Sequence, residues 1–486
     1  MRYGTHGNLD DQSVRDGDEG FLGFASRLDP GIIKESYAAK ATNMRFDRGV
    51  AIVRKGTQVL QTGLSGPFHA IGEIIDGSNN VKVALVGESS THLWEGDILD
   101  LPATLPFVLG SGGSTLDYPA GETVTAADRP FIVQAMNSII IFRGDKTPLV
   151  LEGHSGGLQF TPLQLPSVLP FALGQDAFST STIPASPMGV EVGGRLVVIK
   201  DNYTLAFSNS GTLVLDAINE FPVNLGDNDP IVAVSPYQED KILIWKERSI
   251  HIMTNISTLS DSVISEVTRQ HGLQARDSVA QVGDQVFYLS TSGISALTGS
   301  VGSDGTSIRV VKVVDDPLSA PIDDLVAKID MKWSRSYARG CYHDNRYYLA
   351  VPMTDLPDHT SGNNAVLVYS MLNHAWESRD TLKLNPDMLV PAMYGGQRRL
   401  MLAQRSGTLV LADQDSTDYN SATTGNDTIV GTLKTRRYHH NNRGELKRYR
   451  VGAFNWETLG DSSATISYKV TTNDPDTEMS SRTVST

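Results

Sequence analysis

Residues 195–215, RLVVIKDNYTLAFSNSGTLVL, show the local pattern that decides the fold. An apolar, β-branched run, Arg195–Ile199, is followed by a polar turn at Asp201-Asn202 and a second run, Thr204–Phe207. Asn and Asp tolerate the backbone conformations of tight turns, so the two runs are expected to pair as a β-hairpin. A second turn signal, Ser208–Gly211, precedes a further short run, Thr212–Leu215, which predicts at least one more strand.

The same paired runs recur along the chain. Their first runs begin at residues 81, 138, 195, 241, 285, 346 and 399, so the starts lie 44 to 61 residues apart. A repeat of this length holding several short strands is typical of a β-propeller. A single four-stranded blade cannot bury both faces, whereas radial packing of blades covers them. We therefore predict an all-β protein, a β-propeller of about six to eight blades with an additional β-rich domain formed by the terminal segments. The alternative is a β-sandwich or another multi-sheet β protein.

Shifts in composition predict how the chain is divided. Two short helices are also expected, one within residues 30–40 with Asp29 as N-cap and one after Ser319, with Pro321 in its first turn. The second helix is interpreted as a connector between blades, because Ile322, Leu325 and other apolar residues share one of its faces. The predicted parts are a flexible acidic N-terminal arm (1–20), an N-terminal β segment (21–80), the propeller (81–412), a linker (413–427) and a C-terminal β-rich segment (428–486).

Composition and charge exclude several classes of protein. The 486 residues are 40% hydrophobic and include 44 Gly and 22 Pro, which indicates a folded, turn-rich chain. Cys341 is the single cysteine, so an internal disulfide framework and a multi-cysteine metal site are excluded. No apolar run approaches the length of about 18 residues that a membrane-spanning helix needs, and the polar start of the chain predicts no signal peptide. A net charge of −14 disfavours a protein that grips DNA by its phosphates.

Motifs that carry chemistry are weak. The glycine-rich stretch Gly110–Ser114 lacks the Gly-Lys-Ser/Thr of a phosphate-binding loop and is interpreted as a flexible loop. His439-His440 are interpreted as surface histidines, because adjacent residues of a strand point to opposite faces. Cys341 is interpreted as a buried or half-buried thiol rather than a nucleophile. We predict no catalytic residue, no cofactor, no metal and no enzyme activity.

Carboxylates leave one enzymatic alternative open. Glycoside hydrolysis needs two carboxylates that face each other across a cleft. The candidates are more simply interpreted as residues that begin a turn and a helix: Asp315, Asp316, Asp323 and Asp324.

Cationic residues form two candidate interfaces. Arg45, Arg48 and Arg54 flank a predicted strand, and we expect them to form bidentate pairs in packing or in subunit contacts. A second cluster carries seven cations against Glu445 alone, and the choice between protein contact, solvation and nucleic acid stays open. High salt should loosen assembly if this cluster forms an interface, whereas salt-insensitive assembly would indicate an apolar one. Its members are Lys434, Arg436, Arg437, Arg443, Lys447, Arg448 and Arg450.

Four stretches together resemble the β-propeller tail nozzle or tail hub proteins of short-tailed bacteriophages (podoviruses). Arg45–Gly49 with Arg54–Gly56 follows Pro30-Gly31 and Asn43. The other stretches are His271–Gly283 with 286–294, Leu318–Ile322 with Asn345–Pro352, and Val368-Tyr369 with Trp376-Glu377. The resemblance covers roughly residues 21 to 470, and its motifs are structural rather than catalytic.

This resemblance implies a virion structural protein, made in the host cytoplasm, that forms a hexameric ring around a channel for the genome. It also implies contacts with tail adaptor and tail fibre or spike proteins, and DNA that passes through the lumen without specific binding. An acidic chain fits that expectation, since like charge prevents tight phosphate contacts. The alternatives are a carbohydrate-active propeller enzyme, of the sialidase or depolymerase kind, and a free propeller interaction module.

Overall fold

The chain divides into two compact units, residues 17–438 and residues 1–16 with 439–486. The computed structural model describes residues 20–62, 67–75, 81–95, 116–118, 122–136, 138–152, 161–163, 183–283, 285–301, 308–313, 317–437, 463–468 and 480–485. In the second unit, the described strands β37 (Ser463–Tyr468) and β38 (Ser480–Ser485) form an antiparallel pair. All further elements belong to the first unit.

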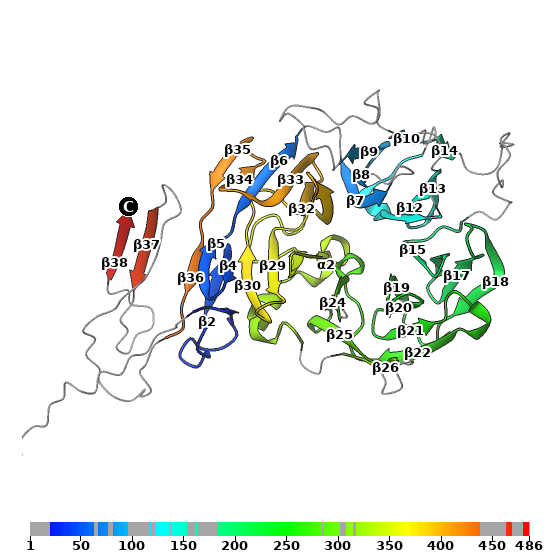
Figure 1. Cartoon of the computed structure of the whole chain (residues 1–486), viewed down its shortest axis with the longest axis horizontal. Coiled ribbons are helices and arrows are strands. Elements are labelled where there is room, and N and C mark those ends of the chain that lie inside the picture. The colour runs from blue at the N-terminus through cyan, green and yellow to red at the C-terminus, as the bar shows by residue number, and fades with distance from the viewer. Residues whose placement is uncertain are drawn as a thin grey trace, which may run out of the picture. The chain divides into compact units, whose positions relative to one another are not determined.

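In the described part of this unit, seven sheets of four or more strands form a β-propeller (Figure 1). We number these sheets as blades 1 to 7 in chain order, and each blade is given from its inner to its outer strand. Blades 1 and 2 are β7 (Phe68–Ile75), β8 (Val81–Gly87), β9 (Ser90–Glu95), β10 (Leu116–Asp117), and β11 (Phe131–Ala135), β12 (Ser138–Arg143), β13 (Lys146–Glu152), β14 (Thr161–Leu163). Blades 3 and 4 are β15 (Gly189–Val192), β16 (Arg195–Asp201), β17 (Thr204–Ser208), β18 (Leu215–Pro222), and β19 (Ile231–Pro236), β20 (Lys241–Lys246), β21 (Ile250–Thr254), β22 (Val263–Thr268).

The remaining three blades continue the same order. Blade 5 is β23 (Ala280–Val282), β24 (Gln285–Ser290), β25 (Gly293–Val301) and β26 (Ile308–Val313). Blade 6 is β27 (Arg339–His343), β28 (Arg346–Val351), β29 (Ala365–Ser370) and β30 (Ala375–Asp380), extended outward by β3 (Lys40–Thr42) and β36 (Thr432–Lys434). Blade 7 is β31 (Met388–Tyr394), β32 (Gln397–Gln404), β33 (Thr408–Asp415) and β6 (Gly56–Gln61).

The ring is closed by a strand from the start of the chain. β6 precedes blade 1 in sequence but pairs antiparallel with β33 as the outer strand of blade 7. The inner strands β31 and β7 of blades 7 and 1 then pack against each other. This exchange removes the free seam that an open array of blades would leave.

Apolar side chains fill the spaces between the blades. Six clusters of buried residues lie between blades 1 and 2, blades 2 and 3, blades 3 to 5, blades 5 and 6, blades 6 and 7, and blades 7 and 1. Trp245 of blade 4 and Tyr288 of blade 5 place their ring centroids 4.8 Å apart. Packing on both faces is what makes a four-stranded blade stable.

The predicted β-propeller is confirmed, and the seven repeated hairpins are the two middle strands of the seven blades. Residues 195–199 and 204–207, for example, lie in β16 and β17, whose central residues are buried. The connector helix is also confirmed: η6 (Ala320–Ile322) and α1 (Asp323–Val326) lie between β26 and β27. A second helix, α2 (Met331–Tyr337), follows it with Asp330 as its N-cap.

Two local expectations are wrong. Residues 30–40 contain a turn followed by β2 (Tyr37–Ala38), which pairs with β1 (Gly23–Phe24), because Asp29 accepts the Gly31 amide at 2.7 Å in a turn rather than capping a helix. Residues 413–427 hold the end of β33, β34 (Thr417–Asn420) and most of β35 (Gly425–Thr428) instead of a linker.

The other helical turns are η3 (Ala126–Asp128), η4 (Leu259–Asp261) and η5 (Arg276–Ser278). In the described part of the chain, no helix has the length and apolar character needed to cross a membrane.

Candidate functional site

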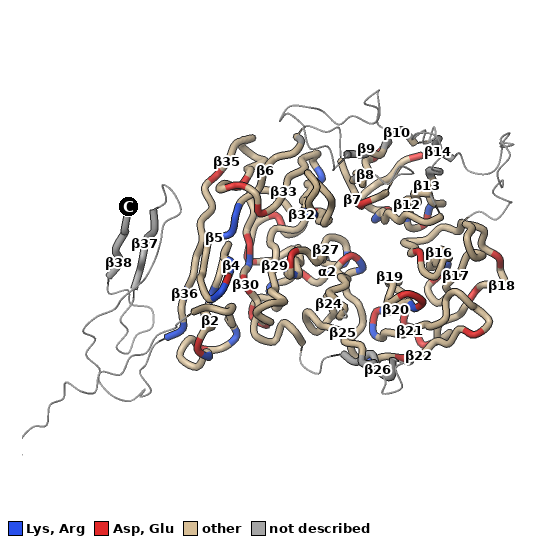
Figure 2. The backbone as a smooth tube through the Cα atoms, viewed as in Figure 1, with Lys and Arg blue, Asp and Glu red and all other residues tan. Residues whose placement is uncertain are grey.

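Segments from both ends of the first unit meet on the outer side of blades 6 and 7. β4 (Met44–Asp47) and β5 (Val50–Val53) form an antiparallel hairpin between β3 and β6. Figure 2 shows basic positions in β4 and beside β5 close to acidic positions near β30. We call the polar side chains at this junction the closure cluster: Asn43, Arg45, Arg54, Asp380, Asp413 and Asp418.

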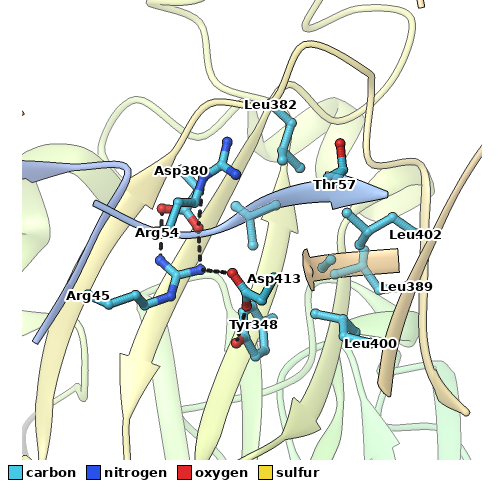
Figure 3. Close-up of a pocket in the computed structure, with 12 residues that line it drawn as sticks. Arg45, Arg54, Thr57, Tyr348, Asp380, Leu382, Leu389, Leu400, Leu402 and Asp413 are labelled. Atoms are coloured by element: carbon cyan, nitrogen blue, oxygen red, sulfur yellow. Dashed lines mark hydrogen bonds and ion pairs between the residues drawn. The ribbon is translucent and has the colours of Figure 1, made fainter. Parts of the chain in front are cut away.

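Arg45 joins the hairpin to blades 6 and 7 (Figure 3). Its Nη1 and Nη2 donate to the two carboxylate oxygens of Asp380 at 3.1 and 2.7 Å. Nη2 also lies 3.6 Å from Oδ1 of Asp413 in β33, and the guanidinium stands 5.9 Å from the ring centroid of Tyr348. Arg45 is only 6% exposed, so this bidentate pair forms out of contact with solvent.

Arg54 makes the equivalent link to β34. Its Nη1 donates to Oδ1 of Asp418 at 2.8 Å, and Nη2 donates to the second oxygen of the same carboxylate. Its Nε donates to Oδ1 of Asn43 at 3.2 Å and lies 3.8 Å from Oδ2 of Asp380. Arg54 is 4% exposed, so the hairpin is fixed by two buried arginines, each with its own carboxylate.

Asn43 connects three segments through its side chain. Its backbone has a φ of 55°, which Asn adopts more readily than most residues. Its Oδ1 also accepts the Thr381 amide at 2.9 Å, and its Nδ2 donates to the Val430 carbonyl at 3.0 Å. The turn between β3 and β4 is thereby bound to the end of blade 6 and to the segment before β36.

The charges of the closure cluster stabilise one another. Burial alone would lower the pKa of Arg45, but Asp380 and Asp413 outweigh it and hold that pKa well above its usual value. Burial alone would raise the pKa of Asp380, but Arg45 and Arg54 hold it below its usual range. Both side chains therefore stay ionised, and removal of either leaves a buried charge without its partner.

A small cavity adjoins these residues (Figure 3). Its volume is about 20 Å³, and it is lined by Arg45, Arg54, Asp380, Asp413 and apolar residues that include Leu400. That volume accommodates about one water molecule and is far below the several hundred Å³ of ordinary ligand pockets. The chemistry of the closure cluster is therefore structural: it holds the terminal segments on the ring.

The structure separates the predicted interface residues into two groups. Arg45, Arg54 and Arg436 are buried within the single chain. Arg48, Lys434 and Arg437 are exposed. Their part in subunit contacts stays a prediction, and four further members of the C-terminal cluster lie outside the described residues: Arg443, Lys447, Arg448 and Arg450.

Those residues considered for catalysis that the structure describes have structural roles. Asp323 forms an ion pair with Arg27 at 3.1 Å, and Asp324 accepts a hydrogen bond from Ser26, so both tie α1 to the N-terminal segment. Cys341 is buried, as expected, and burial raises the pKa of its thiol to about 12. Gly110–Ser114, Asp315, Asp316 and His439-His440 lie outside the described residues. Within the described ranges, no group of His, Cys, Asp and Glu side chains is arranged to hold a metal ion.

The stretches that carry the resemblance contact one another in the fold. The Tyr347 hydroxyl donates to the Ser278 carbonyl at 2.8 Å, which links blade 6 to η5. The Trp376 Nε1 donates to the Leu318 carbonyl at 2.9 Å, and Arg346 pairs with the fully buried Glu377 at 2.7 Å. Together with Arg45 and Asp380, these contacts join blade 5, blade 6 and the N-terminal segment.

One group of charged residues was not found from the sequence. Arg129, Arg276, Arg339 and Arg405 lie in loops or strand starts of different blades, and only Arg276 falls in a stretch discussed above. These arginines occupy related positions in the repeat: each one precedes or begins an inner strand, or lies in the turn between two middle strands. An alignment of the repeats would reveal this relationship in the sequence.

No family model matches the chain, and no curated protein matches it in sequence. Solved structures match it in fold. BamB from Moraxella catarrhalis is 11% identical, over 73% of this chain and 85% of that chain, with a TM-score of 0.39. The WD40 β-propeller domain of Doa1 is 11% identical, over 74% and 98% of the two chains, with a TM-score of 0.41. The β-propeller domain of Cps50 (Swd1) from Myceliophteria thermophila is 7% identical, over 74% and 99%, with a TM-score of 0.43. At this identity the matches concern the fold alone.

Proposed function

We propose that this protein is a structural component of a bacteriophage tail, a nozzle or hub whose copies form a ring around the path of the genome. The tail assignment rests on the resemblance of the four stretches described above. The ring-forming role rests on one observation in the structure, an exposed apolar strand that is rigidly attached to the propeller.

That strand is β5. Val50, Ile52 and Val53 are 59%, 40% and 47% exposed, and Val430, next to Val53 across Gly431, is 72% exposed. Among the described strands, β5 pairs with β4 alone in a two-stranded sheet, so its other edge is not paired with a described strand. Exposed apolar edge strands favour association with another chain.

The closure cluster makes this strand suitable as a binding surface. Arg45, Arg54 and Asn43 fix the hairpin from its buried side through contacts with blades 6 and 7. A surface held in place before binding loses little conformational entropy when a partner docks. We assign the partner as a second copy of this chain, which gives a head-to-tail contact that repeats around a ring. By the resemblance, the ring is a hexamer that meets tail adaptor and tail fibre or spike proteins.

The net charge of −14 supports passage of DNA without retention. An acidic wall repels phosphates and avoids the multiple cation contacts that hold DNA in place. The lumen in this proposal lies between copies of the chain, and the propeller is the body of each copy.

The test is assembly of the full-length chain, measured by sedimentation velocity for wild type and two matched variants. Ile52→Lys should abolish the multimer, because it places a charge in the apolar contact, while Ile218→Lys should not. Ile218 is 87% exposed on the outer strand of blade 3 and serves as the control. Assembly should persist at 1 M NaCl. A multimer that survives Ile52→Lys, or that 1 M NaCl dissolves, would overturn the assigned contact.

A further inference from the structure

Several arginines gather where the inner strands of the propeller begin. Arg129 precedes β11, Arg276 lies in η5 just before β23, and Arg339 is the first residue of β27. Arg405 lies in the turn between β32 and β33, beside Asp387, whose carboxylate accepts the Arg405 amide at 3.0 Å. Inner strands of successive blades run alongside one another, so these positions share one end of the propeller axis. Figure 2 shows acidic and basic positions around α2 and β27.

Two hydrogen bonds show that the arginines reach across the axis. Arg276 of blade 5 donates from Nη1 to the carbonyl of Pro187, before blade 3, at 2.8 Å, and lies 5.4 Å from the ring centroid of Phe131 in blade 2. Arg339 of blade 6 donates from Nη2 to the carbonyl of His69 in blade 1 at 3.4 Å. Arg129 also lies close enough to Arg276 and Arg339, and Arg405 close enough to Arg339, for their charges to interact. The cations of blades 2, 5, 6 and 7 are therefore neighbours although they are far apart in sequence.

The carboxylates at this place are too few for the arginines. Asp277 is fully engaged, since it holds Arg276 at 2.7 and 3.1 Å and Arg339 at 3.3 Å. Glu247 is paired with Arg335 at 2.6 Å. The Asp387 carboxylate accepts a hydrogen bond from the backbone amide of Arg405. The Arg405 guanidinium lies 4.6 Å from the ring centroid of Tyr337.

Arg129 makes no hydrogen bond or ion pair with a carboxylate in the described part of the protein, and the nearby Asp277 is already held by Arg276 and Arg339. It is half-buried, its backbone has a φ of 45°, and its buried Nε has no hydrogen-bond partner in the described part of the protein. Burial, followed by the proximity of Arg276, lowers the pKa of Arg129 to about 10, because Arg339 and Arg335 add to this effect and Asp277 opposes it only in part. An unpaired buried donor beside like charges is costly, and an anion at this position would satisfy both.

We propose that the end of the propeller axis bounded by Arg129, Arg339 and Arg405 binds a small phosphate-class oxyanion. Guanidinium groups present paired donors that match the oxygens of phosphate, and three blades supply them from different directions. The site lies within one copy of the chain and does not depend on the tail assignment. Free phosphate and a phosphate ester share this chemistry and are distinguished in the test.

The test uses the full chain, exchanged into a phosphate-free chloride buffer, and isothermal titration with inorganic phosphate and separately with phosphoserine at constant ionic strength. Saturable binding of phosphate is expected, with affinity at least tenfold weaker in Arg129→Gln and Arg405→Gln. Arg269→Gln is the control, because Arg269 is exposed and forms its ion pair with nearby Glu266 on blade 4. Tighter binding of phosphoserine than of phosphate would identify an ester, and the reverse order free phosphate.

A readout without ligand separates binding from structure. The thermal midpoint of Arg129→Gln in chloride should equal or exceed that of wild type, because the variant removes an unpaired donor and a repelling charge. Addition of phosphate should then raise the midpoint of wild type but not of the variant. The proposal is overturned if neither anion binds, if binding is unchanged in both variants, or if Arg129→Gln destabilises the anion-free protein.

Discussion

Arg45 in β4 and Asp380 at the end of β30 are separated by 335 positions and form a buried bidentate pair, with nitrogen–oxygen distances of 2.7 and 3.1 Å. The pair binds a segment that precedes the ring to β30, the fourth strand of the sixth blade. Because Arg54 binds Asp418 in the same way, two ion pairs hold the segment that also supplies β6 to blade 7. Ring closure and the exposed strand β5 therefore depend on the same buried residues.

The first prediction concerns this pair. Arg45→Met should lower the free energy of unfolding by about 3–5 kcal/mol, because it leaves Asp380 buried next to Arg54 alone. Arg27→Ala is the control: its ion pair with Asp323 is exposed, and such pairs contribute about 0–1 kcal/mol. Urea unfolding of the two variants measures the difference. Equal effects of the two substitutions would show that the buried Arg45–Asp380 pair contributes no more to stability than an exposed ion pair.

The second prediction tests ring closure through two glycines. A Cβ atom at Gly56, in β6, would lie 1.9 Å from the Thr417 carbonyl oxygen of β34, so Gly56→Ala must displace one backbone from the other. A Cβ atom at Gly425 meets nothing closer than 3.7 Å. Gly56→Ala should therefore lower the thermal midpoint by several degrees, whereas Gly425→Ala should leave it nearly unchanged. Similar midpoints for the two variants would contradict the close approach of β6 and β34.

The third prediction concerns pH. The folded-state pKa of Asp380 is below its usual value, so its ionised form contributes stability above the unfolded value, about 4, and that contribution is lost as the pH falls through the folded pKa. The stability gap between wild type and Asp380→Asn should therefore be constant from pH 5 to 7 and narrow below pH 4. Chemical unfolding at each pH measures the gap. A stability gap that widens on acidification would contradict a folded-state pKa of Asp380 below its usual value.

The fourth prediction concerns Cys341. Its thiol is buried, with a pKa raised to about 12, so little thiolate forms at pH 8 and reagents cannot reach it. A chromogenic disulfide reagent should react very slowly with native protein and promptly with one thiol per chain in guanidinium. Rapid reaction of the native protein would indicate that blade 6 opens readily near β27.

The middle strands of the described blades were predicted from the sequence, but the inner and outer strands were not. The further strand expected at Thr212–Leu215 is wrong in position, because β18 begins only at Leu215. Middle strands such as β16 are covered on both sides, so their sequence is a continuous apolar run. Half of the residues of the outer strand β18 are exposed, among them Asp216 and Ile218, while the inner strand β15 has only four residues. Neither has enough apolar residues in sequence to be distinguished from a loop.

The candidate site shows a similar limit. Arg45 and Arg54 were identified as candidates for bidentate pairing, but nothing local points to Asp380 or Asp418 as their partners. Asp418 lies in a polar stretch whose composition is typical of a linker, yet it is buried because Arg54 neutralises it. The exposure of β5 could not be predicted either, because the apolar run Val50–Val53 is typical of a buried strand.

Electron microscopy of the purified full-length chain tests most directly whether the protein is a ring-forming building block. We expect closed rings in which propellers surround an open lumen and neighbouring copies meet at β5, with a mass several times the 52.6 kDa of one chain. A particle that stays monomeric at every concentration, or a ring whose contacts leave β5 in solvent, would contradict the proposed function.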